Sequence, residues 1–156
     1  MIRKFKFEIF ADYHQFYLQD DDPSFGDLSN AWTEDATARL LAVAPRVIGI
    51  GTVRNMNVPV LVTFHNSRPA INEDNWDHIV AASLRVDSGK IVIAGCTDYF
   101  PDAARIEVEP GTYEAIVCYS NLSSVSEDGL NGEDAYHIHF FQGKEILPVT
   151  IKNWTR

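Results

Sequence analysis

The sequence predicts a mainly β protein, either an antiparallel β-sandwich or an open barrel, with one α-helix near residues 33–44. Three observations favour this fold class: short segments with apolar residues at every second position, turn-forming residues between them, and one stretch of helical spacing. With 156 residues, of which 46% are hydrophobic and 12% aromatic, the chain can bury a core without disulfide or metal support. We therefore expect a single β-sandwich-like domain over residues 1–156.

Two strands are expected at the beginning of the chain. Apolar and charged side chains alternate over residues 2–10, which predicts a strand with one face in water. Residues 12–18 predict a second short strand, and three carboxylates followed by Pro23 are expected to end it. A polar loop then extends to about residue 31.

The helix near residues 33–44 has recognisable signals at both ends. Thr33 can cap its first turn, and Glu34 and Asp35 lie where the helix dipole favours anions. Pro45 is expected to end the helix because proline cannot continue it. The apolar stripe that this helix would bury consists of Ala36, Leu40, Val43 and Ala44.

The rest of the chain is dominated by short β-type segments. We expect eight further strands, at residues 46–53, 58–65, 79–86, 90–94, 103–108, 112–119, 136–141 and 145–152. Turn residues separate several of them, at 54–57, 87–89, 109–111 and 142–144. Residues 121–134 are small, polar and acidic, and we expect them to form a long mobile loop.

Composition narrows the classes of function. The chain has 13 Lys and Arg against 22 Asp and Glu, and its net charge of −9 opposes direct nucleic-acid binding and favours a basic protein partner. No stretch approaches the roughly 20 apolar residues of a membrane span, and the first ten residues lack a signal-peptide core. We expect a cytoplasmic protein without a membrane partner, whose oligomeric state the sequence leaves open.

The sequence carries no recognisable catalytic or cofactor motif. Cys96 and Cys118 have no CxxC spacing, so neither a disulfide nor a zinc site is indicated, and both are expected to be buried thiols. Gly-x-Ser-x-Gly, the nucleophile elbow, does not occur. Gly49-Ile50-Gly51 is half of a dinucleotide fingerprint inside a strand pattern, which indicates a bulge or a close backbone approach. We therefore predict no enzyme, no catalytic residues and no cofactor.

One pattern points to a metal as an alternative. His137 and His139 are two residues apart in a predicted strand, so their imidazoles share a face, and Glu145 could add a carboxylate from the next strand. The pair resembles the histidine motif of the cupins, which implies a small-ligand or metal-binding β-barrel. The other interpretation is that both histidines lie on the wet face of the strand while Tyr136, Ile138 and Phe140 pack inward.

Carboxylates gather in the predicted loops and at the predicted helix start. There they can meet a partner without disturbing the core, and a negative surface accelerates encounter with a positive one. A nuclease is the expected basic partner because an enzyme that holds DNA must display a basic groove; solubility alone is the other explanation. The carboxylates predicted to bind the partner are Asp20, Asp21, Asp22, Asp27, Glu34, Asp35, Glu127, Asp128, Glu133 and Asp134.

Two motifs near the start of the chain resemble a known family. Tyr13-His14-Gln15-Phe16, followed after the acidic loop by Trp32-Thr33-Glu34-Asp35-Ala36, is similar to the opening of the competence protein J family. Pro110-Gly111-Thr112-Tyr113 and Asp134-Ala135-Tyr136 resemble later parts of the same family, so the resemblance covers residues from about 3 to 141. The family-motif residues are Tyr13, His14, Gln15, Phe16 and Trp32.

The resemblance implies a small acidic protein that acts by binding and that inhibits a DNA-entry nuclease of competence. It brings no catalytic residues and no cofactor. Reasoning from the residues leaves two other functions open. One is a small-ligand or metal-binding barrel that uses the face of His137 and His139, and the other is a subunit that pairs through an exposed sheet edge.

Overall fold

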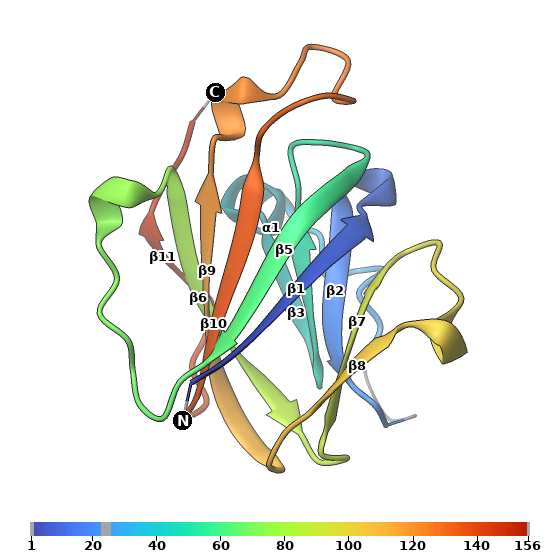
Figure 1. The fold of residues 1–156 in the computed structure, drawn as a ribbon, viewed down its shortest axis with the longest axis vertical. Coiled ribbons are helices and arrows are strands. Elements are labelled where there is room, and N and C mark those ends of the chain that lie inside the picture. Colours follow the sequence, from blue (N-terminus) through green and yellow to red (C-terminus); the bar gives the residue numbers. More distant parts are fainter. Residues whose placement is uncertain (1, 23–25, 156) are drawn as a thin grey trace.

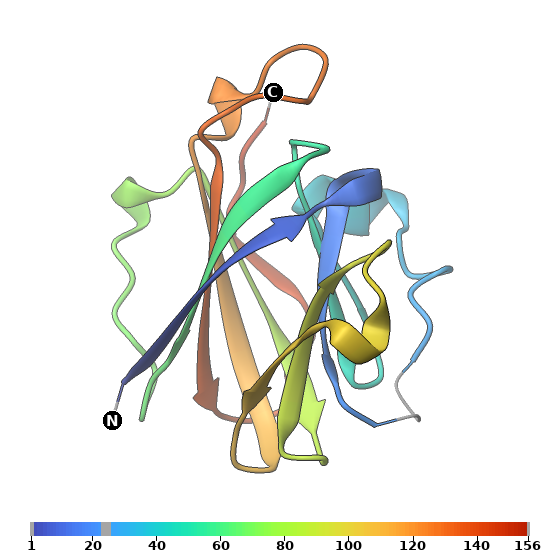
Figure 2. The same ribbon diagram turned by 45° about the vertical axis from the view of Figure 1, so that its right-hand side comes forward.

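Two β-sheets face each other in the computed structural model, which describes residues 2–22 and 26–155 (Figure 1; Figure 2). The six-stranded sheet contains, in spatial order, β1 (Arg3–Phe10), β5 (Asn57–Phe64), β10 (Ala135–Gln142), β9 (Gly111–Ser120), β6 (His78–Val86) and β11 (Val149–Lys152). The five-stranded sheet contains β3 (Leu41–Ala44), β4 (Val47–Gly51), β2 (Gln15–Asp20), β7 (Lys90–Gly95) and β8 (Ala104–Glu107). The predicted mainly β class is confirmed, and of the two predicted architectures the described strands form the sandwich.

Short helical elements connect the strands. They are α1 (Glu34–Arg39) and the 3₁₀ turns η1 (Asp12–His14), η2 (Glu73–Asn75), η3 (Phe100–Asp102) and η4 (Leu122–Ser124). Among the residues that the structure describes, no helix is long and apolar enough to cross a membrane.

Strand pairing is antiparallel except between β5 and β10. These two strands run in the same direction, with Tyr136 opposite Val60 and Ile138 opposite Val62. Each of the other strand pairs that we describe is antiparallel. The exception is physically reasonable because strands far apart in sequence are not joined by a tight turn, so no turn dictates their direction.

The core lies between the two sheets and follows the predicted alternation. Phe16 and Leu18 of β2 belong to the same apolar cluster as Val60 of β5 and Ile138 of β10, and all four are almost fully buried. Burying each such side chain contributes about 1.5–3 kcal/mol to stability. The alternation therefore determines which face of each strand points inward, as expected for residues at a period of two.

The predicted helix at residues 33–44 is correct only in its first half. Thr33 caps α1 as expected, since its Oγ1 accepts a hydrogen bond from the backbone nitrogen of Ala36 at 3.2 Å. The helix ends at Arg39, Leu40 adopts a left-handed conformation, and Leu41–Ala44 form strand β3 beside β4. The apolar sequence of β3 is compatible with a helix or a strand, and pairing with the buried strand β4 favours the strand. Pro45 therefore follows a strand, not a helix.

The second predicted strand is shifted toward the C-terminus. Residues 12–14 form η1, and β2 runs from Gln15 to Asp20, so Asp20 is the last residue of the strand and not the first of the loop. Tyr13 and His14, with φ of 60° and 58°, lie in the left-handed region, which is incompatible with a strand. Pro23, the other expected terminator, lies outside the described residues.

Two predictions near the C-terminus are modified. The strand expected at 145–152 is present only as β11, and Glu145 precedes it. The predicted long loop at 121–134 contains η4 and is bridged by hydrogen bonds, including one from the backbone nitrogen of Ser126 to the carbonyl of Asn131 at 2.7 Å. Leu122 of this loop is buried in the core. The mobility of the loop stays a prediction.

A second, smaller apolar cluster covers the outer face of the six-stranded sheet. Its buried members are Ile79, Ala81, Ile116, Cys118 and Phe141, and Ile71, Trp76 and Ile146 pack against them. Burial raises the pKa of the Cys118 thiol to about 12. The prediction of two buried thiols is wrong for Cys96, which directly follows the end of β7 and is exposed.

Candidate functional site

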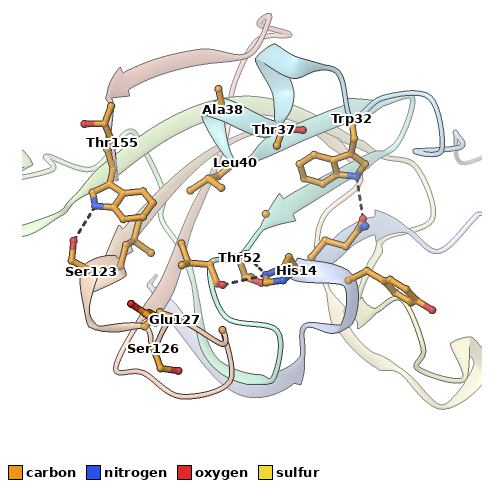
Figure 3. Close-up of a pocket in the computed structure, with 18 of the residues that line it drawn as sticks. His14, Trp32, Thr37, Ala38, Leu40, Thr52, Ser123, Ser126, Glu127 and Thr155 are labelled. Atoms are coloured by element: carbon orange, nitrogen blue, oxygen red, sulfur yellow. Dashed lines mark hydrogen bonds between the residues drawn. The ribbon is translucent and has the colours of Figure 1, made fainter.

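A cleft of about 1230 Å³ opens at one end of the sandwich, close to α1 and the loop that contains η4 (Figure 3). Five parts of the chain that are far apart in sequence line it. They are η1 with Gln15, Trp32 with α1 and Leu40, residues 51–53 at the end of β4, residues 122–129, and residues 153–155. Loops at the end of a rigid β-scaffold are a common place for a binding site.

Four of the five family-motif residues meet in this cleft. Tyr13, His14, Gln15 and Trp32 line it, whereas Phe16 points into the core. The indole Nε1 of Trp32 donates a hydrogen bond to Oε1 of Gln15 at 3.0 Å (Figure 3). This hydrogen bond therefore connects the two family motifs, which an acidic loop separates in the sequence.

Gly49 provides the space for the Trp32 ring. A Cβ atom on Gly49 would lie 3.0 Å from Cζ2 of Trp32 and 3.0 Å from Cδ1 of Leu28. On the same strand, a Cβ on Gly51 would lie 3.2 Å from Cα of Leu40. The expected close approach at Gly49-Ile50-Gly51 is thus what the structure shows, and both glycines support walls of the cleft.

We expect Gly49→Ala to lower the free energy of unfolding by about 1 kcal/mol, because Trp32 and Leu28 must move by a few tenths of an ångström to admit the methyl group. Urea unfolding would measure the loss, and the tryptophan emission spectrum would report the displaced ring. Gly143→Ala is the matched control, since its added methyl would also meet a side-chain carbon at 3.0 Å, but that carbon belongs to Glu114, which does not line the cleft. An unchanged emission spectrum in Gly49→Ala would contradict the proposed support of Trp32.

Three residues around the cleft hold a left-handed backbone without being glycine: Tyr13, His14 and Leu40, with φ between 58° and 60°. Such conformations cost about 1 kcal/mol or more each and persist where neighbours enforce them. Here Nδ1 of His14 lies 3.2 Å from the carbonyl oxygen of Thr52 and 3.1 Å from that of Val53. Nδ1 therefore carries the proton and donates. This turn holds the Tyr13 ring outward, where it is 69% exposed.

His78 connects α1 with the C-terminal residues 153–155, which line different parts of the cleft. Its Nε2 donates to the carbonyl oxygen of Arg39 at 2.7 Å, and its Nδ1 accepts from the backbone nitrogen of Trp154 at 3.0 Å. Burial lowers the pKa of His78, which favours the neutral ring that this bonding pattern requires. The indole nitrogen of Trp154 also donates to Oγ of Ser123 at 3.3 Å (Figure 3).

The rim of the cleft is anionic. Glu127 and Asp128 are exposed, and the described residues that line the cleft include no lysine or arginine. Hydrogen bonds from the Ser126 hydroxyl and the backbone nitrogen of Leu130 lower the pKa of Asp128, which keeps it ionised. Two of the ten carboxylates predicted to bind a partner therefore lie at the cleft, although their role there stays a prediction.

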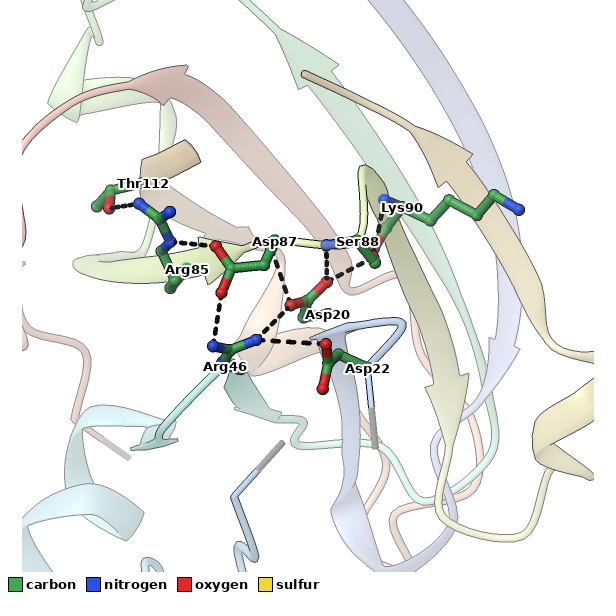
Figure 4. Close-up of polar contacts among 8 residues, drawn as sticks. All are labelled: Asp20, Asp22, Arg46, Arg85, Asp87, Ser88, Lys90 and Thr112. Atoms are coloured by element: carbon green, nitrogen blue, oxygen red, sulfur yellow. Dashed lines mark hydrogen bonds and ion pairs between the residues drawn. The ribbon is translucent and has the colours of Figure 1, made fainter. Parts of the chain in front are cut away.

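Asp20 does not lie on the surface, and its expected position in a solvated loop is wrong. The side chain is fully buried, and its two oxygens accept hydrogen bonds from the backbone nitrogens of Asp87 and Ser88 at 2.9 and 3.1 Å (Figure 4). Arg46 contacts Asp20 at 3.3 Å and Asp22 at 3.5 Å. Contacts inside the protein therefore neutralise much of the negative charge of this run of aspartates.

Asp134 is also fully buried, so the expectation that it faces a partner is wrong. Its Oδ1 lies 2.8 Å from Nε of Arg54, and its Oδ2 accepts a hydrogen bond from the Tyr136 hydroxyl at 2.6 Å. The Tyr136 oxygen in turn accepts from the backbone nitrogen of Val53, a residue of the cleft wall, at 3.1 Å. Asp134 therefore fixes the segment after β4.

The remaining predicted carboxylates differ in their surroundings. Asp21 pairs with Arg105 at 3.0 Å, and Asp27 accepts a hydrogen bond from the backbone nitrogen of Ser29 at 2.8 Å. Glu34 and Asp35 occupy the first turn of α1, directly after Trp32. Those that are exposed are Asp27, Glu34, Asp35, Glu127, Asp128 and Glu133.

The histidine pair lies on the opposite face of β10 from the core and joins a third histidine. The rings of His137 and His139 are 3.9 Å apart, and Nε2 of His65 lies 2.8 Å from Nδ1 of His139. Nε2 of His137 contacts Oγ1 of Thr63 at 2.9 Å. These nitrogens bond to each other or to Thr63. Within the described ranges, no group of three or more His, Cys, Asp or Glu side chains could hold a metal ion.

The other interpretation of the pair is correct for its neighbours and wrong for one histidine. Tyr136, Ile138 and Phe140 pack inward as expected. His139, however, is only 8% exposed, so it does not lie on a wet face. Two neighbouring rings explain the difference, because those of His65 and His137 lie 5.1 and 3.9 Å from the His139 ring and cover it.

Half of the cleft was not predicted from the sequence. Trp154, Leu122 and the backbone of Val53 contribute walls, and none of them belongs to the family motifs. The available signal was weak: Trp154 is a large aromatic residue in a short polar tail, and Leu122 is an apolar residue in a polar loop. Isolated apolar residues are also common on protein surfaces, so neither residue identifies a wall of the cleft from the sequence alone.

The facing sheets define a class of β-sandwich that is shared with two proteins of known structure. One is ComJ from Bacillus subtilis, described as the inhibitor of the DNA degrading activity of NucA: the TM-score is 0.71 at 21% identity, over 92% of this chain and 99% of that chain. The other is described as crocagin biosynthetic gene J, with a TM-score of 0.58 at 17% identity, over 92% and 98% of the two chains. No family model matches the sequence, and no curated protein has a significant sequence match to it. The resemblance to the competence protein J family is confirmed as a likeness of fold.

Proposed function

We propose that this protein acts by binding, without catalysis, and that it blocks a nuclease by occupying the surface that holds DNA. The observation that carries the proposal is the fold shared with ComJ over 92% of this chain, since that protein is described as the inhibitor of a DNA-degrading activity. The four family-motif residues that meet in the cleft support the proposal, because they form part of a surface and not only of the core.

The charge of the chain is consistent with such a partner. A nuclease must present lysine and arginine to the phosphate backbone, so its DNA-binding surface is cationic. The net charge of −9 attracts a cationic surface and speeds encounter, while complementary charges fix the orientation of the complex. The predicted carboxylates that can take part are the exposed ones, namely Asp27, Glu34, Asp35, Glu127, Asp128 and Glu133.

Mixing the protein with basic nucleases should suppress DNA cleavage in proportion to the amount added, up to one equivalent. Light scattering after size exclusion would give the stoichiometry of the complex. We expect inhibition to weaken as NaCl rises from about 0.1 M to about 1 M, because the screening length falls from about 10 Å to about 3 Å.

An unrelated acidic protein of the same net charge is the control and should not inhibit under the same conditions. Unchanged DNA cleavage at low salt across a panel of basic nucleases would contradict the proposal. Inhibition that is equal at low and high salt would contradict its electrostatic part.

A further inference from the structure

We infer that the cleft receives an arginine or lysine side chain carried on a loop of the protein partner. The inference rests on the proposed function and deepens it, because it names the surface that binds and the chemistry that is recognised. It follows from four properties of the cleft: its size, its aromatic walls, its charge and the rigidity of its side chains.

The size fits a short stretch of polypeptide. Sites for small molecules typically have volumes of about 300–1000 Å³. The cleft has about 1230 Å³ and is open on one side, so an extended segment of a partner can enter it and leave again. Figure 3 shows Trp32 on one side and Ser123 on the other, with Leu40 and Thr52 between them.

Aromatic rings on both sides suit a cation. Trp32 and Trp154 lie in different walls, and the exposed Tyr13 stands beside Gln15 at the entrance. A guanidinium or ammonium group over an indole or phenol face gains about 0.5–2 kcal/mol, and guanidinium also stacks on such rings. A cationic side chain that enters between these walls can therefore contact aromatic surface along its length.

Carboxylates at the rim supply the countercharge. Glu127 and Asp128 lie on the same loop, and the described lining holds no positive side chain that would neutralise them. A carboxylate can accept two parallel hydrogen bonds from one guanidinium, which fixes its orientation. An acidic or nucleic-acid segment would be repelled, and an apolar segment would strip water from Glu127 without replacing its hydrogen bonds.

The walls are held in place before any partner arrives. Trp32 is fixed by its bond to Gln15, and Trp154 by its bonds to His78 and Ser123. The left-handed turn at Tyr13 is fixed by the His14 ring against the backbone of residues 52 and 53. A preformed site loses less conformational entropy on binding, so modest contacts can yield specific recognition.

The test uses a defined probe, the peptide acetyl-Gly-Arg-Gly-Arg-Gly-amide, and the same peptide with citrulline in place of arginine. Citrulline keeps the shape of arginine and removes its charge. Titration followed by amide chemical shifts should show binding of the arginine peptide, with the largest changes at residues 12–15 and 122–129. We expect the citrulline peptide to bind at least about tenfold more weakly. Equal binding of the two peptides, or shift changes outside the cleft, would overturn the inference.

Two variants with equal changes of net charge separate the site from the overall charge. Glu127→Gln with Asp128→Asn keeps the oxygen that Ser126 and Leu130 use, and should weaken binding of the arginine peptide about tenfold. Asp102→Asn with Glu107→Gln changes two exposed carboxylates outside the cleft lining and should retain binding within about twofold. An equal loss in both variants would mean that net charge alone attracts the peptide, and would refute the cleft as the binding site.

Failure of the inference and failure of the proposed function give different results. If the arginine peptide binds in the cleft but no nuclease is inhibited, the inference stands and the proposed function is wrong. If a nuclease is inhibited equally by wild type and by Glu127→Gln with Asp128→Asn, and the peptide does not bind, the proposed function stands and the inference is wrong.

Discussion

Replacing Asp20 with alanine should lower the free energy of unfolding by about 4 kcal/mol, a large fraction of the stability of a domain of this size. The carboxylate accepts hydrogen bonds from the backbone nitrogens of Asp87 and Ser88 and from the Ser88 hydroxyl, and it contacts Arg46 (Figure 4). Alanine would remove the acceptor that these part-buried donors share, and a buried donor left without an acceptor costs about 1–3 kcal/mol.

Urea unfolding at neutral pH would measure this loss, with Asp21→Ala as the matched control. Asp21 is the neighbouring carboxylate, and its removal changes the net charge equally. Its pair with Arg105 is about one-quarter exposed on both sides, so we expect a cost below about 1 kcal/mol. Similar losses in the two variants would contradict the structural role that we assign to Asp20.

Asp20 shows what the sequence could and could not indicate. Three successive aspartates suggest a solvated loop, and for Asp21 and Asp22, which are only partly buried, the loop interpretation is close to correct. Phe16, Leu18 and Asp20, however, occupy alternate positions of one strand. The period of two therefore places the Asp20 carboxylate on the same inward face as the two apolar side chains. The pattern was present, but the Arg46 and Ser88 partners lie 26 and 68 residues away and could not be inferred from it.

The fold class was predictable because alternation and turn residues are local properties. Most of the predicted strands are present, and Thr33 caps α1 as expected. The errors arise where distant pairing decides. Leu41–Ala44 pair with β4 and do not extend the helix. The parallel pairing of β5 with β10 cannot be recognised in the amino-acid pattern of either strand. Strand order likewise depends on contacts between segments that are far apart along the chain.

The candidate site was predictable only in part, for the same reason. The motif residues Tyr13, His14, Gln15 and Trp32 were recognised as a group, and the structure brings them together. The opposite wall comes from residues 122–129 and 153–155, more than 80 residues further along the chain. It is positioned by single contacts such as that between His78 and Trp154, which no sequence period encodes.

Acid should destabilise the protein well above the pH at which its carboxylates take up protons. Burial is the main cause that lowers the pKa of His137 to about 4 and that of His139 to about 3. The positive charge of Lys4 and the neighbouring rings act in the same direction, and His65 also has a lowered pKa through burial. The other groups against the rings, Thr63 and Trp76, provide no negative charge to stabilise a protonated cluster.

The direction of the effect follows from proton binding. An unfolded histidine titrates near 6.5, so below that pH the unfolded chain binds protons that the folded cluster does not. The cluster's contribution is complete above pH 6.5 and is lost as the pH falls toward about 4 and 3. Because His137 remains partly exposed, water screens part of the effect, and we expect a loss of about 3 kcal/mol for the two histidines between pH 7.5 and 5.

Urea unfolding at a series of pH values would measure this slope in wild type and in the double variant His137→Gln, His139→Gln. The variant can differ in absolute stability, but its slope between pH 6.5 and 5 should be much smaller, because two of the groups that take up protons on unfolding are gone. The interval from pH 8 to 7 is an internal control, since histidine is mostly neutral in both states there. Carboxylates remain mostly ionised above pH 5, and His65 and His78, whose pKa values burial also lowers, supply the part of the slope that the variant keeps. A slope in the variant equal to that of wild type would contradict the role assigned to His137 and His139.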